Sequence, residues 1–199
     1  MRHPNRTVVA LLGLTIVLSG CTAAEPESPA ARPSHSTSTQ AHSPTPAAAA
    51  GTRVNPYAVG TMGRYDPESV WSFTGQSTDP NATAAIMAAN EFNEQPAAGQ
   101  VYVSTKSTIS LADSAAASAG ADPYASFTIA YVGNDGNTYE DKQCAVPAPD
   151  TRYQSLGTMY GGATAVGSVC AIVPSGAVAG GAWSIRSQVK PAVAFFSAS

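Results

Sequence analysis

The chain has 199 residues, of which 44% are hydrophobic and 12% are charged, with a formal net charge of −3. This length has room for one ordinary domain, and the hydrophobic content is that of a globular protein. No run of basic residues is present to neutralise phosphates, so the composition argues against a nucleic-acid partner and against binding to an anionic membrane surface by charge.

The amino-terminal segment resembles the signal peptide of a bacterial lipoprotein. Two arginines precede an apolar run over residues 8–18, and Leu18-Ser19-Gly20-Cys21 has the form of a lipobox. The resemblance implies cleavage after residue 20 and a lipid on Cys21. The apolar run is shorter than the ~20 residues that a membrane-spanning helix needs. We therefore expect attachment by lipid, at the extracytoplasmic face of the cell membrane.

Residues 21–52 consist mainly of Ala, Pro, Ser and Thr without apolar periodicity. Such a segment cannot bury enough apolar surface to offset the entropy lost on ordering, so it is predicted to be a linker between Cys21 and a folded domain over residues 53–199. Its Ser and Thr residues could also carry sugars, as in mucin-like stalks.

From Arg53 onward, short alternating runs separated by Gly, Pro, Asn and Asp predict an all-β domain. The clearest strand covers residues 101–110. Its predicted core face holds Val101, Val103, Thr105, Ser107 and Ile109, and its predicted solvent face holds Tyr102, Ser104, Lys106, Thr108 and Ser110.

Four more runs complete the pattern of predicted strands. Trp71 with Phe73, Phe127 with Ile129 and Tyr131, and Trp183 with Ile185 each alternate, whereas residues 164–173 are apolar on both faces, which predicts a central strand covered on both sides. Residues 133–137, Gly-Asn-Asp-Gly-Asn, predict a hairpin turn. Residues 111–122 are predicted to form a long loop. Residues 82–89 fit a helix by propensity or a strand by context, and we favour the strand.

Seven or more short strands in one domain predict an immunoglobulin-like β-sandwich, with a barrel as the alternative. Several short motifs also occur in a characteristic order. They are Asn90-Glu91-Phe92-Asn93, Tyr131-Val132-Gly133 before Asp135-Gly136, the segment leading to Cys170, Val173-Pro174-Ser175-Gly176, and the closing Ala194-Phe195-Phe196. In these residues the chain resembles the telokin-like, immunoglobulin-like domain of unknown function found in lipoproteins of actinobacteria and other Gram-positive bacteria. The resemblance implies a fold and an envelope location, and no catalytic residue.

Two cysteines remain once Cys21 is assigned to lipid. Thiols oxidise outside the membrane, so we expect a disulfide between Cys144 and Cys170. The alternative, a metal or redox site built on cysteine, lacks a C-x-x-C motif.

No histidine follows His42, which argues against a Ser-His-Asp or Cys-His catalytic system and against most zinc sites in the domain. We expect no catalytic residue, no metal site and no cofactor. Paired carboxylates remain as an alternative, and the candidates are Glu91 with Glu94 and Glu140 with Asp141. Because adjacent strand residues point to opposite faces, we interpret Glu140 and Asp141 as separately solvated charges.

The sequence thus favours a lipid-anchored, non-enzymatic module that binds an envelope protein, peptide or polymer. The alternatives are an envelope hydrolase or inhibitor-like accessory that uses acidic loop residues, and a structural or antigenic surface lipoprotein without a ligand. Loops carry function more often than strands do. The predicted interaction residues are therefore loop residues, namely Asp113, Asp122, Asn134 and Asp135.

Overall fold

A computed structural model describes residues 48–142 and 144–199. The predicted signal peptide, the lipobox with Cys21 and most of the predicted linker lie outside the described residues. Within them, no helix is both long enough and apolar enough to cross a membrane.

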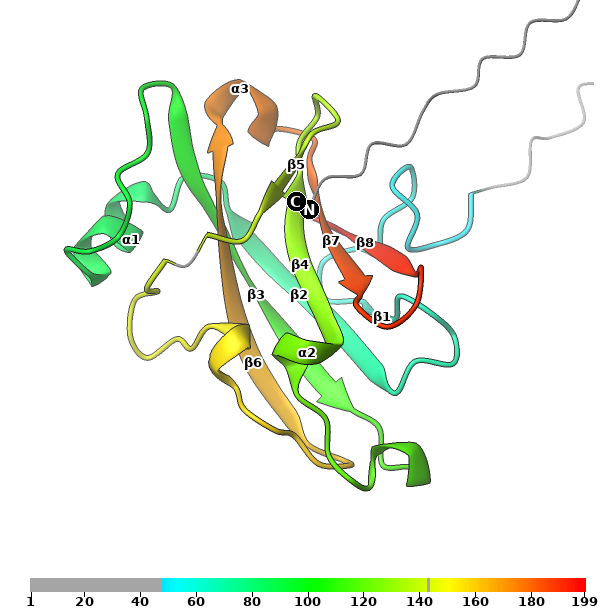
Figure 1. Ribbon diagram of the computed structural model, residues 1–199. Coiled ribbons are helices and arrows are strands. Elements are labelled where there is room, and N and C mark those ends of the chain that lie inside the picture. Colours follow the sequence, from blue (N-terminus) through cyan, green and yellow to red (C-terminus); the bar gives the residue numbers. More distant parts are fainter. Residues whose placement is uncertain (1–47, 143) are drawn as a thin grey trace, which may run out of the picture. The chain divides into compact units, whose positions relative to one another are not determined.

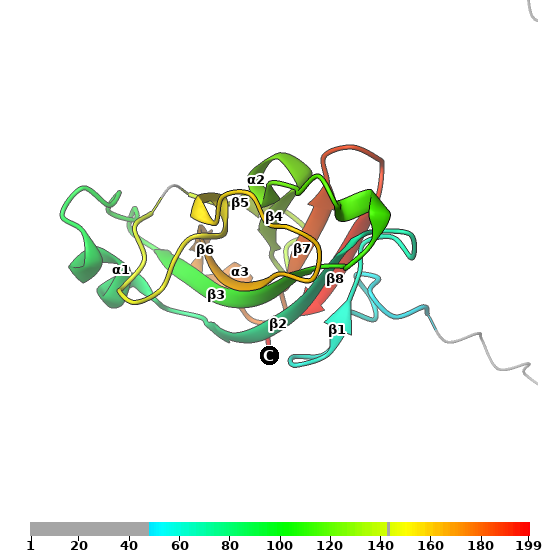
Figure 2. The same ribbon diagram turned by 90° about the horizontal axis from the view of Figure 1, so that it is seen from below.

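Two antiparallel sheets of four strands form separate layers, which confirms the predicted all-β sandwich (Figures 1 and 2). The first sheet has the order β1-β2-β3-β6 and the second the order β5-β4-β7-β8. The strands of the first sheet are β1 (Met62–Gly63), β2 (Trp71–Asp79), β3 (Gln100–Leu111) and β6 (Thr164–Pro174). Those of the second are β4 (Phe127–Val132), β5 (Thr138–Glu140), β7 (Ala182–Ser187) and β8 (Val193–Ser197).

In the part of the chain that the structure describes, five short helices lie in the connections between strands. They are α1 (Thr83–Ala89), η1 (Ala115–Ala117), α2 (Pro123–Ser126), η2 (Tyr153–Ser155) and α3 (Ser175–Val178). In immunoglobulin constant domains the first two strands share a sheet with the fifth and fourth. Here β1 and β2 share a sheet with β3 and β6, so the chain has the layers of that architecture with its own strand order.

The main core lies between the two sheets and is rich in aromatic side chains. Phe73 of β2 contacts Phe127 of β4 edge to face with ring centroids 4.8 Å apart, and Tyr131 contacts Trp183 in the same way at 5.1 Å. The large apolar residues that alternate along β2, β4 and β7 are buried in this core. The alternation predicted for these three strands is therefore confirmed.

Residues 83–89 form helix α1, so the preference for a strand in this segment was wrong. Alanine, the strongest helix former, supplies four of the seven residues, and Ile86 is the one buried side chain of the helix. Ile86 packs on the outer face of β3 against Tyr102 and the two cysteines, in a second, smaller core. Tyr102 is fully buried there, which corrects its predicted exposure to solvent.

Strand β6 is the edge of its sheet, so the prediction of a central strand for residues 164–173 was also wrong. Both faces of its second half are nevertheless buried, because alternate residues face the main core between the sheets and the second core beside α1. In addition, an irregular segment runs along its free edge. The Lys142 N–H donates to the Cys170 carbonyl oxygen at 3.0 Å, and the Ser168 N–H donates to the Thr151 carbonyl oxygen at 2.8 Å. This covering segment, residues 141–142 and 144–155, therefore occupies part of the free edge of β6.

The outer edge of β8 is covered by the first described residues. The Phe195 N–H donates to the Gly51 carbonyl oxygen, and the Tyr57 N–H donates to the Phe195 carbonyl oxygen, both at 2.8 Å. The folded unit therefore includes Gly51, two residues before the predicted start of the domain at Arg53.

Candidate functional site

A hollow of about 720 Å³ opens where β5 is too short to cover β4. Strand β5 pairs only with residues 130–132 of β4, and after Glu140 the chain crosses to the edge of β6 (Figure 1). Among the described residues, the first half of β4 has no strand partner on this side. The volume is in the range of small-molecule sites.

Four elements and the covering segment supply the side chains around this hollow. They are Thr128 and Ala130 of β4, Thr138 and Glu140 of β5, Ser184 and Arg186 of β7, Tyr124 of α2, and Asp141, Arg152, Tyr153 and Gln154 of the covering segment. The lining is mostly polar because it combines the outward faces of three strands with a loop that crosses between the sheets.

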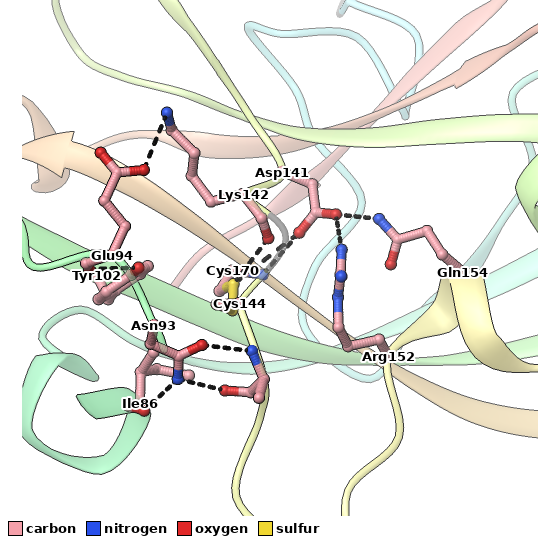
Figure 3. Close-up of a disulfide and its surroundings, with 11 residues drawn as sticks. Ile86, Asn93, Glu94, Tyr102, Asp141, Lys142, Cys144, Arg152, Gln154 and Cys170 are labelled. Carbon is pink, nitrogen blue, oxygen red and sulfur yellow. Dashed lines mark hydrogen bonds and ion pairs between the residues drawn. A yellow bond between two sulfur atoms is a disulfide. The ribbon is translucent and has the colours of Figure 1, made fainter. Parts of the chain in front are cut away.

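Asp141 is the centre of the wall formed by the covering segment (Figure 3). Its Oδ2 lies 2.5 Å from Nη2 of Arg152 and accepts a hydrogen bond from Nε2 of Gln154, while Oδ1 accepts one from the Cys170 N–H at 3.4 Å. Burial raises the pKa of Asp141, and the Arg152 charge and these hydrogen bonds oppose that rise. Both carboxylate oxygens are therefore held by the protein.

The hydroxyl of Tyr153 closes the uncovered edge of β4. It accepts a hydrogen bond from the Ile129 N–H at 3.4 Å, and its ring stacks on Phe127 with centroids 5.7 Å apart. Burial raises the pKa of Tyr153 to about 12. The side chain is therefore a neutral phenol that anchors η2 to the core rather than an acid or base for chemistry.

The disulfide predicted between Cys144 and Cys170 is present, with Cα atoms 6.7 Å apart. It links Cys144, three residues after Asp141, to Cys170 in the middle of β6. Closing a loop between residues 26 apart in the sequence contributes about 3 to 4 kcal/mol in the loop-entropy picture. The disulfide therefore holds the wall of the hollow against the first sheet.

Asn93 fixes the other side of the disulfide (Figure 3). Its Nδ2 donates to the carbonyl oxygens of Ile86 and Ala145 at 2.5 and 3.0 Å, and its Oδ1 accepts from the Ala145 N–H at 2.7 Å. The Tyr102 hydroxyl donates to the carbonyl oxygen of Glu94 at 2.7 Å. These bonds tie the loop after α1 to the covering segment, so the hollow rests on a rigid support.

Several polar groups at the hollow are not used by the protein itself. Nε of Arg152 and Oε1 of Gln154 are buried without a hydrogen-bond partner. Of the Lys and Arg side chains in the described part of the chain, Arg186 alone makes neither a hydrogen bond nor an ion pair with described residues. Arg186 is exposed and is therefore available to a ligand, whereas the two buried atoms lie beneath the surface of the hollow.

The predicted interaction residues lie outside the lining of the hollow. Asp122 caps α2, where its Oδ1 accepts a hydrogen bond from the Tyr124 N–H at 2.8 Å, so it positions one residue of the lining. Asp113 is exposed in the same connection, between β3 and η1.

Asn134 and Asp135 lie in the β4–β5 turn, at the opposite end of β4 (Figure 1). Asn134 Nδ2 donates to the carbonyl oxygens of Gly176 and Ala179 at 3.1 and 2.8 Å. Asp135 Oδ2 accepts from the Tyr139 hydroxyl at 2.6 Å, and this bond, with those from Asn137, lowers the pKa of Asp135. The turn itself is confirmed, with Gly136 at a φ of +85°.

The two candidate carboxylate pairs differ in placement. Glu91 and Glu94 are exposed in the loop after α1, away from the hollow. Glu140 and Asp141 both line the hollow, which corrects the expectation that they lie on opposite faces; Glu140 is exposed as expected, and the Asp141 side chain is buried. The reason is that the strand ends at Glu140, so the period of two no longer applies to Asp141.

Sequence reasoning missed Tyr124, Arg152, Gln154 and Arg186. Arg152 and Gln154 lie in a segment without periodicity, and nothing in their spacing indicates that they meet Asp141. The direction of the Arg186 side chain could have been inferred from the sequence. Arg186 follows the buried Ile185 in strand β7, so its side chain faces outward. Within residues 48–142 and 144–199, no three His, Cys, Asp or Glu side chains come together as a metal site would require.

Comparison with known proteins gives no activity. No protein-family model and no curated protein match the chain. A conserved hypothetical protein from Bacillus anthracis is similar over 68% of this chain and 94% of its own, with 10% identity and a TM-score of 0.42. An uncharacterized β-sandwich protein from Clostridium difficile is similar over 70% of this chain and 92% of its own, with 11% identity and a TM-score of 0.39. The chain contains a β-sandwich domain of unknown function, and the geometry of its hollow is the guide to what it does.

Proposed function

We propose that the chain is a lipid-anchored binding module of the extracytoplasmic membrane face, and that the hollow beside β5 holds its ligand. The membrane attachment rests on the lipobox that ends at Cys21 and on the linker that follows. The resemblance to the telokin-like domains of Gram-positive lipoproteins agrees with this location. The ligand is a component of the envelope within reach of the linker.

One observation carries the binding role, and it is the set of unused polar groups at the hollow. Glu140 and Arg186 are exposed charges of opposite sign at the hollow. The Arg186 side chain makes no hydrogen bond or ion pair with the described residues, so its guanidinium is open to a ligand group.

Two observations favour the hydrolase alternative. Glu140 and Asp141 line the same hollow, and burial raises the pKa of Asp141. A general acid must offer its proton to a substrate, however, and both oxygens of Asp141 are engaged by Arg152, Gln154 and the Cys170 N–H. The geometry therefore favours binding over hydrolysis.

Co-sedimentation with an envelope preparation from the cells that make the protein tests the proposal. The full chain in detergent is incubated with purified wall and membrane fragments, and the bound fraction is measured. Glu140→Arg inside the hollow should abolish the binding. Glu91→Arg makes the same change of charge at an exposed position outside the hollow, and should leave the bound fraction unchanged. Equal binding by both variants would refute the proposal.

A further inference from the structure

We propose that the ligand of the hollow is a saccharide that carries a carboxylate group, with a sugar ring against Tyr124 and the carboxylate paired with Arg186. This inference rests on the proposed function, since it names the ligand class of the same site.

Tyr124 provides a flat, exposed and well-positioned ring at the hollow. Its side chain is 60% exposed. Its backbone is held on both sides, because its N–H donates to Asp122 Oδ1 at 2.8 Å and its carbonyl oxygen accepts from Gln188 Nε2 at 2.7 Å. The C–H face of a pyranose ring packs against an aromatic face, and a ring on a fixed backbone loses little entropy when it does so.

The polar groups beside Tyr124 match sugar hydroxyls. Glu140 supplies a planar carboxylate that can accept from two neighbouring hydroxyls, and Thr128 and Thr138 supply hydroxyls of their own. A sugar hydroxyl, which is donor and acceptor at once, can bind to the Glu140 carboxylate and to either threonine hydroxyl.

Arg186 indicates that one ligand group is anionic. Its guanidinium is exposed on β7 and has no protein partner among the described residues, whereas Arg152 is neutralised by Asp141. Planar guanidinium groups bind carboxylates through two parallel hydrogen bonds. The total charge of the site is balanced, because Glu140 offsets Arg186. A single carboxylate at Arg186 therefore fits better than a polymer with a phosphate on every unit.

Two defined tetrasaccharides test the inference. The first is hyaluronan tetrasaccharide, which carries glucuronate carboxylates, and the second is its carboxyl-reduced form, in which each glucuronate is replaced by glucose, so the two probes share their linkages and N-acetyl groups and differ in the carboxylate. Calorimetric titration of the full chain in detergent should give a dissociation constant about fivefold or more lower for the carboxylated probe. Arg186→Gln should reduce this preference to below about twofold by weakening only the carboxylated probe. Lys142→Gln, which removes the same charge outside the hollow, should preserve it.

The ring contact has its own matched control. Tyr124→Ala should weaken both probes by about fivefold, and Tyr124→Phe should keep the binding of both within about twofold. Tyr160 is 61% exposed and lies outside the hollow, so Tyr160→Ala should change neither.

Three results would overturn the inference. The first is equal affinity for the two probes. The second is a preference for the carboxylated probe that is unchanged in Arg186→Gln, and the third is an affinity for both probes that is unchanged in Tyr124→Ala. If neither tetrasaccharide binds while envelope fragments still bind in a Glu140-dependent manner, the saccharide is the wrong ligand class and the binding module stands. If the fragments also fail to bind, both proposals fall.

Discussion

Asp141 and Arg152 form an ion pair of 2.5 Å, and only 8% and 18% of their side chains are exposed. The two residues belong to opposite ends of the segment that covers β6, so their contact closes this segment on itself beside the hollow. Two charges taken out of water are stable only while each satisfies the other. The ion pair is therefore expected to specify the position of the wall more than to add stability of its own.

Removing one partner of this ion pair should lower the stability of the domain substantially. Asp141→Ala leaves the Arg152 charge poorly compensated, and we expect the free energy of unfolding to fall by about 3 kcal/mol in urea denaturation. Lys106→Ala breaks the more exposed pair with Asp150, 2.8 Å apart, and should cost less than about 1 kcal/mol. Equal costs for the two variants would show that the Asp141 pair does not organise the covering segment.

Two aspartates should respond to pH in opposite directions. Burial raises the pKa of Asp141, so the folded state takes up its proton more readily. The contribution of this carboxyl to stability therefore falls as pH rises from the ordinary value of 3.8 through the folded pKa. The Tyr139 hydrogen bond lowers the pKa of Asp135, so its contribution is full above 3.8 and is lost as pH falls through the folded pKa.

Urea denaturation over an acidic to neutral pH series checks this contrast. The stability of the wild-type chain minus that of Asp141→Asn should decrease with rising pH, and the same difference for Asp135→Asn should increase. Two differences of the same sign would contradict the assignment of burial as the main influence on Asp141.

The disulfide should stabilise the domain substantially. Replacing both Cys144 and Cys170 by Ala should lower the free energy of unfolding by about 3 kcal/mol, through the entropy of the opened loop. A reducing agent should destabilise the wild-type chain by a similar amount and leave the double variant unchanged. A wild-type chain that is insensitive to reduction under denaturing conditions would contradict the prediction.

Asn93 should contribute more to the stability of the domain than its position in a surface loop suggests. It is 8% exposed, and Asn93→Ala removes three hydrogen bonds and leaves the Ile86 and Ala145 groups unpaired, which should cost about 2 to 4 kcal/mol. Asn134→Ala removes two hydrogen bonds at an exposed position, where water replaces the lost partner, and should cost about 1 kcal/mol or less. Thermal unfolding of the two variants compares these values directly.

The anchor is tested separately from the domain. Cells that express the full chain should incorporate radiolabelled palmitate into it and retain it in the membrane fraction, and Cys21→Ser should abolish both. Incorporation of label into the Cys21→Ser variant would disprove the proposed lipid site.

The sequence predicted those parts of the fold that depend on local patterns. Period-two alternation located β2, β3, β4 and β7, and the Asp-Gly turn located the β4–β5 hairpin, because each rests on neighbours within a few residues. Cysteine counting predicted the disulfide. Tyr102 was misplaced because a face that alternation assigns to water can be covered by another element, here α1.

The same limit explains why the hollow was missed. It exists because β5 stops after three residues and the chain then crosses to the other sheet, and the sequence around Glu140 carries no marker of that crossing. Arg152 and Gln154 meet Asp141 only through this crossing. The apolar run of β6 suggested a central strand because an edge strand whose outer face is covered by a second core has the same pattern in the sequence.

The central claim is that the hollow beside β5 is where this chain meets its ligand. Amide chemical-shift mapping by NMR tests it most directly, with the full chain in detergent titrated with a soluble digest of the envelope. We expect the largest shifts at Thr128, Glu140 and Arg186, and no change at Phe92 and Asn134. Shifts centred on Phe92 or on the Asn134 turn, with the hollow unperturbed, would contradict it.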